Sequence, residues 1–231
     1  MNNKNAVIYV HGYGGNGSES PVLKKLASVL NPEKQILIPF LWNSGNINSS
    51  VISDISQIMK NFASDTIERS TVSLIEKILK SDTKSDFTLS QARSCILGRS
   101  LEKYLKQNIN NINDISIISF SLGTRIVHDF LKICNDGELL AKINKVIMLA
   151  PAMPEDSKAE LKHIRKVKPG FLIEAYYSPD FDLALKVVYS MAGNASRAAG
   201  EVGFSNSELY KNIKVNFCHS EYDKVIDYLN I

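Results

Sequence analysis

A serine placed between a predicted strand and a predicted helix is the residue of this chain best suited to covalent chemistry. The apolar run Ile115–Phe120 leads into Ser121, Leu122 and Gly123, and an amphipathic pattern follows at once. This order is typical of a nucleophile elbow, the sharp turn that exposes a serine hydroxyl above a parallel sheet. Ser119 stands where the usual Gly-x-Ser-x-Gly pattern has its first glycine, and its side chain is small enough for that position. The stretch therefore predicts that Ser121 is a nucleophile.

The ends of two later predicted strands supply a carboxylate and an imidazole. Asp182 follows the fifth strand and His219 follows the sixth. A serine hydroxyl is a weak nucleophile that needs a base within hydrogen-bonding reach, which His219 would provide. A carboxylate would fix the tautomer of that imidazole and stabilise its charged form. Asp182 is the predicted acid, and Asp180 on the same loop is an open alternative.

Asp223 gives a competing assignment of the acid. Many hydrolases carry their acid in a loop like the one after the sixth predicted strand, with the histidine further along the chain. Only eight residues follow Asp223, and none of them is histidine. Under this assignment the chain would be a dead enzyme or a truncated one.

Backbone N–H groups at two predicted turns could bind the oxyanion of a tetrahedral intermediate. Leu122 follows the serine at the start of a predicted helix, and Tyr13 lies in the glycine-rich loop after the first strand. Such donors stabilise the negative charge that develops on the reacting carbonyl oxygen. His11 and Gly12 precede Tyr13, and we expect them to support the loop structurally.

The same loop also matches a dinucleotide-binding pattern, Gly12-x-Gly14-x-x-Gly17. That motif requires an acidic residue about 20 positions later, at the end of the second strand. The second predicted strand ends in Ile38-Pro-Phe-Leu-Trp42, which contains no carboxylate, and no Walker lysine follows the glycines. No nucleotide cofactor is therefore expected.

Six short apolar segments, most of them separated by helical patterns, predict a parallel sheet covered by helices on both faces. The expected strands are Ala6–Val10, Gln35–Phe40, Ile115–Phe120, Lys145–Leu149, Phe171–Tyr176 and Ile213–Phe217. Helical patterns cover Ser20–Leu30, where proline follows the first serine, and Leu122–Ile133. The predicted fold class is α/β, with a mostly parallel six-stranded sheet in one domain that spans residues 1–231.

A long insertion separates the second and third predicted strands, at about residues 43–111. Two helices are expected in it, Ser50–Lys80 and Thr88–Gln107, joined by the polar residues 81–86 and followed by a loop at Gln107–Asp114. One apolar face of the second helix would comprise Ala92, Ile96, Leu97, Leu101, Tyr104 and Leu105. The insertion could be a lid, a dimer surface or a layer packed on the sheet. The segment Met191–Asn206, rich in glycine and alanine, is expected to be a mobile rim above the site.

Charge and cysteine content narrow the partners and the compartment. The net charge of +3 is too small to indicate nucleic-acid binding, which needs a clustered basic face. The basic run Lys162–Lys168 is expected to be a solvated helix end. Three cysteines are an odd number and do not suggest a disulfide framework, and the N-terminus has no signal-peptide pattern. A cytoplasmic location is therefore predicted. No apolar run approaches the roughly 20 residues that a membrane span needs.

The histidines and cysteines are too scattered to suggest a metal site, so neither a metal nor an organic cofactor is expected. Neighbouring residues on a strand point to opposite faces, which disfavours a thiol–imidazole pair of Cys218 and His219. Core packing is the predicted role of the three cysteines, Cys95, Cys134 and Cys218.

These motifs together resemble the α/β-hydrolase fold over nearly the whole chain. Three segments also resemble a narrower group, the poorly characterised hydrolase-like family that includes the eukaryotic "transmembrane and coiled-coil domain" proteins. They are Phe120–Arg125, the pair Tyr177-Ser178 with Asp182-Leu-Ala-Leu185, and His219-Ser-Glu-Tyr222. The resemblance implies a serine hydrolase or lipase-like activity.

The sequence therefore predicts a serine hydrolase that transfers an acyl group to Ser121 and hydrolyses the acyl-enzyme. Its substrate would be a carboxylic ester or a thioester, of a small molecule or a lipid. Two other classes of function stay open: a binding or scaffold protein that kept the fold without turnover, and an acyltransferase that uses the same three residues. The sequence leaves protein partners unknown.

Overall fold

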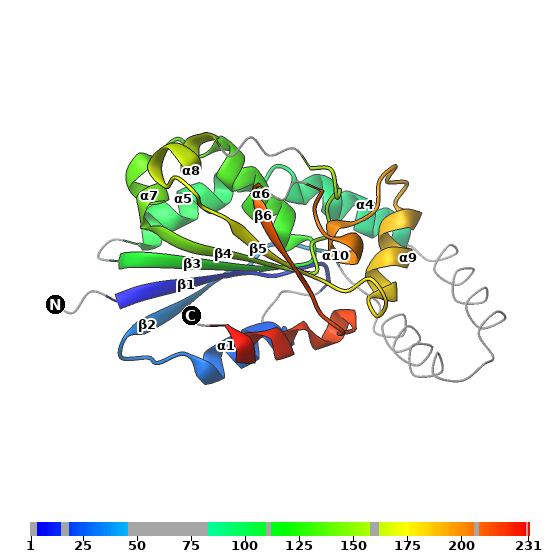
Figure 1. Cartoon of the computed structure of the whole chain (residues 1–231), viewed down its shortest axis with the longest axis horizontal. Coiled ribbons are helices and arrows are strands. Elements are labelled where there is room, and N and C mark those ends of the chain that lie inside the picture. Colours follow the sequence, from blue (N-terminus) through cyan, green and yellow to red (C-terminus); the bar gives the residue numbers. More distant parts are fainter. Residues whose placement is uncertain are drawn as a thin grey trace.

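Six parallel strands form one sheet at the centre of the molecule (Figure 1). The computed structural model describes residues 4–14, 19–45, 83–109, 112–157, 162–205, 208–229 and 231. The strands are β1 (Lys4–Val10), β2 (Gln35–Phe40), β3 (Ile112–Phe120), β4 (Ile143–Leu149), β5 (Ile173–Tyr177) and β6 (Tyr210–Lys214). Their order across the sheet is β2-β1-β3-β4-β5-β6, and each neighbouring pair is parallel. The predicted α/β class and six-stranded parallel sheet are confirmed.

Helices cover both faces of this sheet. The described helices are α1 (Pro21–Val29), α4 (Thr83–Ser94), α5 (Gly98–Asn108), α6 (Gly123–Ile133), α7 (Gly137–Lys142), α8 (Lys162–Val167), α9 (Leu183–Met191), α10 (Ala199–Val202) and the 3-10 helix η1 (His219–Tyr228). In Figure 1, α5 to α8 lie above the sheet, and α1 and η1 lie side by side below it. The carboxyl ends of the strands point to the right, toward α4, α9 and α10.

Strand β1 owes its central position to an unbroken apolar sequence. Ala6–Val10 of β1 is at most 1% exposed, as expected for a strand covered on both faces. Helix α6 packs on this layer with one buried stripe that contains Ile126, Val127, Phe130 and Leu131. Its register places the residues at the start of α6 against the ends of β1 and β3.

The prediction for the sixth strand was wrong in its boundaries. Ile213–Phe217 was expected, but β6 is Tyr210–Lys214 and has β5 as its one neighbour. An edge strand tolerates polar side chains, and the exposed Lys211 and Asn212 conceal it in the sequence. His219 therefore does not follow the strand directly, because residues 215–218 lie between them. The fifth strand likewise begins at Ile173 and not at Phe171.

The predicted helix Thr88–Gln107 is in fact two helices, α4 and α5, separated at residues 95–97. The break brings Gly98 against α6, where a Cβ would lie 2.6 Å from the backbone nitrogen of Phe130. Ile96 is consequently 72% exposed, so the predicted single apolar face is wrong. Helix α4 also begins inside the predicted polar linker, and β3 begins inside the predicted loop Gln107–Asp114. The predicted helix Ser50–Lys80 lies outside the described residues.

Two smaller predictions also need correction. Within Met191–Asn206, predicted to be a mobile rim, Ala199 is fully buried and its N–H donates to Met153 O at 2.8 Å. The described part of that segment is therefore packed on the loop after β4. Core packing fits Cys134, which is buried, but Cys95 is exposed. Among the described helices, none combines the length and the apolar character needed to cross a membrane.

Candidate active site

Ser121 occupies a strained turn between β3 and α6. Its φ angle is +52°, a value that residues other than glycine seldom adopt, and Ser121 is 3% exposed. The N–H of Ser121 donates to Leu149 O at 2.9 Å, and its carbonyl accepts from the Thr124 hydroxyl at 2.6 Å. These contacts with β4 and α6 impose the strained conformation, which is a common feature of functional sites.

Glycines allow this turn to pack closely against the end of β1. A Cβ on Gly123 would collide with the carbonyl oxygens of Val10 and His11. A Cβ on Gly12 would lie 2.7 Å from the Cβ of Ser121. Ser119, at the position of the usual first glycine, is fully buried and donates its hydroxyl to Ile147 O at 3.2 Å. A serine therefore fits at this buried position because its side-chain hydroxyl has a hydrogen-bond partner.

Asp182 and His219, separated by 37 residues in sequence, are in direct contact. His219 Nδ1 lies 2.8 Å from Asp182 Oδ2. The Asp182 side chain is fully buried, whereas that of His219 is 25% exposed. Since Asp182 Oδ1 also accepts the N–H of Leu185 at 3.0 Å, both carboxylate oxygens are occupied. The carboxylate thus caps helix α9 and orients the imidazole at the same time.

The two alternative acids lie elsewhere. Asp180 is exposed, and its carboxylate pairs with Lys214 at 3.0 Å. Asp223 lies within η1, and among the described residues it has no hydrogen bond to His219. Of the three carboxylates considered from the sequence, the structure brings Asp182 to the imidazole.

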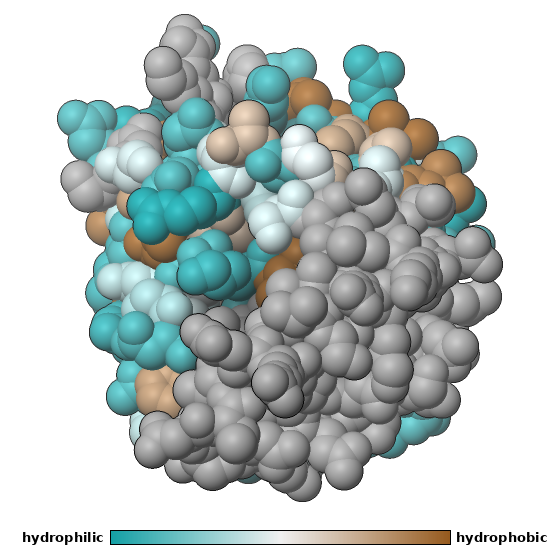
Figure 2. Space-filling view, turned by 90° about the vertical axis from the view of Figure 1, so that its right-hand side faces the viewer, coloured by the Kyte–Doolittle hydropathy of each residue, from teal (hydrophilic) through white to brown (hydrophobic). Residues whose placement is uncertain are grey.

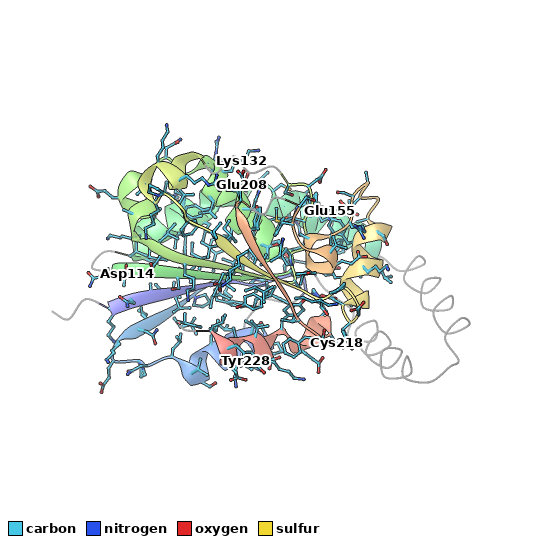
Figure 3. The ribbon with its side chains drawn as sticks, viewed as in Figure 1. Asp114, Lys132, Glu155, Glu208, Cys218 and Tyr228 are labelled. Carbon is cyan, nitrogen blue, oxygen red and sulfur yellow. The ribbon has the colours of Figure 1, made fainter. Side chains whose placement is uncertain are left out.

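His219 begins η1 and lies beside the serine turn. Its ring centroid is 4.8 Å from that of Phe120, the residue before Ser121. The preceding residue, Cys218, lies at the carboxyl edge of the sheet (Figure 3), where its N–H donates to Glu221 at 3.0 Å. No hydrogen bond within the described part of the chain joins Ser121 Oγ to His219 Nε2. In free enzymes such contacts are often long and shorten when substrate binds.

His11 is fixed by two contacts of its own ring. Nδ1 lies 2.9 Å from Gly12 O, and Nε2 accepts the backbone N–H of Trp42 at 3.1 Å. Nε2 must be unprotonated to accept, and burial lowers the pKa of His11 accordingly. The indole of Trp42 in turn donates to His11 O at 2.8 Å. This neutral histidine connects the end of β1 to the segment after β2.

The two predicted oxyanion donors come from two separate segments that meet at the serine turn. Leu122 follows it in the chain, and Tyr13 follows Gly12, whose Cα faces the Cβ of Ser121. Neither backbone N–H has an acceptor among the described residues. Within the part of the chain that the structure describes, both N–H groups are therefore free to donate a hydrogen bond to a ligand oxygen.

Sequence reasoning assigned no role in the site to three residues of this region. Trp42 is the one tryptophan of the chain, and its position at the end of β2 was a signal that could have been used. Tyr222 is fully buried beside His219, with ring centroids 6.3 Å apart, and burial and the nearby Asp182 charge raise its pKa. Asp86 accepts a hydrogen bond from the Tyr13 hydroxyl. The two residues are 73 positions apart, so no local sequence pattern reveals this contact.

Comparisons with known proteins give a family and a partial relative. The model of the family described as "Protein of unknown function (DUF726)" matches residues 45–229. An uncharacterized membrane protein of Schizosaccharomyces pombe is 34% identical over 104 residues, which is 45% of this chain. The chain spans 17% of the length of that relative.

Solved structures with a similar outline include two named hydrolases. A carboxylesterase from Bacillus cereus is 13% identical, with a TM-score of 0.44 over 99% of this chain and 88% of that one. The poly(3-hydroxybutyrate) depolymerase LpqC from Bordetella parapertussis is 10% identical, with a TM-score of 0.47 over 98% and 78%. At such identities and TM-scores, these similarities say nothing about the reaction of this chain.

Proposed function

We propose a reaction for this chain, which belongs to the family described as "Protein of unknown function (DUF726)": it is a serine hydrolase that cleaves a carboxylic ester through an acyl-enzyme on Ser121. The observation that carries the proposal is the contact of His219 with the fully buried carboxylate of Asp182. A strained serine turn lies directly beside that imidazole. An oriented histidine next to a serine on a strained turn is the arrangement that nucleophilic catalysis requires.

In the proposed reaction, Ser121 Oγ attacks the ester carbonyl carbon while His219 Nε2 accepts the hydroxyl proton. Asp182 stabilises the resulting imidazolium without taking its proton. The oxygen of the tetrahedral intermediate accepts hydrogen bonds from the N–H groups of Leu122 and Tyr13. The carbon–oxygen bond of the ester then breaks, and His219 returns the proton to the departing alcohol. Water attacks the acyl-enzyme by the same steps and releases the acid and the free serine.

Apolar side chains at the carboxyl edge support an ester with an apolar acyl portion. Leu41 after β2, Leu89 on α4 and Phe181 before α9 are between 44% and 51% exposed. Figure 2 looks onto this edge and shows hydrophobic residues exposed among hydrophilic ones. Because burying apolar surface is favourable, such side chains would bind an acyl chain better than a charged substrate.

Hydrolysis of p-nitrophenyl butyrate by the full chain tests the proposal. We expect Ser121→Ala and His219→Ala to lower turnover at least about a thousandfold, because Ser121, His219 and Asp182 would act as a unit. Ser119→Ala is the matched control, since it removes a serine hydroxyl two residues away. Adding a primary alcohol shows whether water or the alcohol receives the acyl group, which distinguishes a hydrolase from an acyltransferase. Turnover that survives in Ser121→Ala would contradict the proposed nucleophile.

A further inference from the structure

The glycine-rich loop after β1 contacts the serine turn on one side and helix α4 on the other. Gly12 faces Ser121 so closely that a Cβ would lie 2.7 Å from the serine Cβ. The next residue, Tyr13, donates its hydroxyl to Asp86 Oδ2 at 3.0 Å. Its ring also meets the ring of Phe87 edge-on, with centroids 5.0 Å apart. The side chain of Tyr13 is thus attached to α4 while its backbone lies near the serine.

The beginning of the insertion converges on the same point. The N–H of Gly14 donates to Ser44 O at 3.5 Å, and Gly45 has a φ angle of +89°. A Cβ on Gly45 would collide with the Asp86 carboxylate and lie 2.8 Å from Tyr13 Cε2. Only glycine satisfies both the backbone angle and the lack of space. Residues near the start of the insertion and residues of α4, in its middle part, therefore meet at Tyr13.

The hydrogen bond from the Tyr13 hydroxyl to Asp86 limits which group of Tyr13 could contact a substrate. Because that hydroxyl already donates to a carboxylate, it is not the donor for an oxyanion. The backbone N–H, which has no acceptor among the described residues, is the group left for that role. The side chain of Tyr13 then has a different role, which is to position its own backbone.

We infer that helix α4 sets the geometry of the oxyanion hole, with Asp86 as a positioning residue that acts through the Tyr13 hydroxyl. The inference rests on the proposed function. It gives the insertion at residues 43–111 a role in the reaction: a displacement of α4 shifts Tyr13 and weakens stabilisation of the transition state. Oxyanion donors act on charge that exists only in the transition state, so their displacement lowers kcat more than it changes KM.

Steady-state hydrolysis of p-nitrophenyl butyrate by single and double variants tests this inference. Tyr13→Phe keeps the ring contact with Phe87 and removes only the hydroxyl. We expect it to lower kcat about tenfold, with KM within about twofold of wild type, because small misplacements at a reacting centre are costly. Asp86→Ala should lower kcat by a similar factor. The double variant should lose no more than either single variant, because the two residues act through one hydrogen bond.

Two further variants separate positioning from a general loss of stability. Asp86→Asn keeps an acceptor oxygen for the Tyr13 hydroxyl and should restore kcat to within about threefold of wild type. Tyr104→Phe is the matched control, since it removes a tyrosine hydroxyl of α5 that donates to Pro39 O at 3.1 Å. Its kcat should equal that of wild type.

The outcomes distinguish this inference from the proposed function. If wild type turns over and loses activity in Ser121→Ala, but Tyr13→Phe retains full kcat, the inference is wrong and the proposed function stands. A double variant whose loss of kcat equals the product of the two single losses would also contradict the inference. If wild type turnover does not depend on Ser121, the proposed function itself is wrong.

Discussion

The two halves of the candidate site are built in different ways. The serine half, formed by the ends of β1 and β3 and the start of α6, depends on close packing: Gly12 and Gly123 have no room for a Cβ, and Ser121 is strained. The acid–base half, at the ends of β5 and β6, depends on polar contacts, with both oxygens of Asp182 occupied. Steric changes should therefore damage the serine half, whereas changes of charge should damage the acid–base half.

The largest effect is expected from a change of charge in the acid–base half. Asp182→Asn keeps an oxygen for the N–H of Leu185 and so preserves the cap of α9. It removes the carboxylate that, in the proposed reaction, fixes the tautomer of His219 and stabilises its imidazolium, a loss that typically costs about 10⁴-fold in kcat. Measured kcat and melting temperature should show activity lost and stability nearly unchanged.

Asp180→Asn is the matched control, because Asp180 lies two residues away on the same loop. Its exposed carboxylate contacts Lys214, and surface ion pairs of this kind contribute little. It should keep the kcat of wild type. Equal losses in the two variants would mean that the acid–base half does not depend on the charge of Asp182.

A steric change in the serine half should reduce stability. In Gly123→Ala the new methyl group would collide with the carbonyl oxygens of Val10 and His11, so β1 and α6 must separate. Overpacking of this kind costs about 1–3 kcal/mol of unfolding free energy, which urea denaturation would measure.

Gly137→Ala provides the control for this prediction. Gly137 begins α7, and a Cβ there would have no neighbour within 4 Å. The substitution should be neutral or slightly stabilising. If both glycine variants have the free energy of wild type, close packing is not what defines the serine half.

A smaller effect, which depends on pH, is expected from a buried histidine on α6. Burial, together with the positive charges of Lys132 and Arg125, lowers the pKa of His128 on α6 from 6.5 to about 4. The unfolded chain takes up this proton near pH 6.5 and the folded chain does not. The stability associated with neutral His128 is therefore complete above pH 6.5 and is lost as the pH falls toward 4.

His128→Gln should accordingly flatten the decrease in melting temperature between pH 6.5 and pH 4.5. The difference in melting temperature between wild type and variant at each pH gives the effect of His128 alone, because the carboxylates that titrate in the same range are present in both proteins. An identical pH dependence in the two proteins would show that protonation of His128 does not oppose folding.

Much of the serine half could be predicted from the sequence because its signals are local. The β-branched run before Ser121 and the glycine after it specify strand, turn and helix over about nine residues. The central strands were equally clear, since burial on both faces favours mostly apolar sequence. The order of the three candidate catalytic residues followed from the strand ends.

The acid–base half was harder because its placement depends on contacts between distant segments. The choice between Asp180 and Asp182 is decided by burial at the start of α9, which composition does not reveal. The boundaries of β6 were hidden by the polar residues that an edge strand tolerates. The contact between Tyr13 and Asp86 depends on the packing of α4, so no pattern of spacing could have predicted it.

The central claim is that Ser121 becomes the nucleophile when His219 removes its proton. Covalent labelling with a fluorophosphonate, located by mass spectrometry of peptides, tests this most directly because the probe reacts with an activated serine. The account predicts an adduct on Ser121 in wild type, strongly slowed labelling in His219→Ala and none at this site in Ser121→Ala. An unlabelled wild type, or an adduct on another residue that persists in Ser121→Ala, would contradict it.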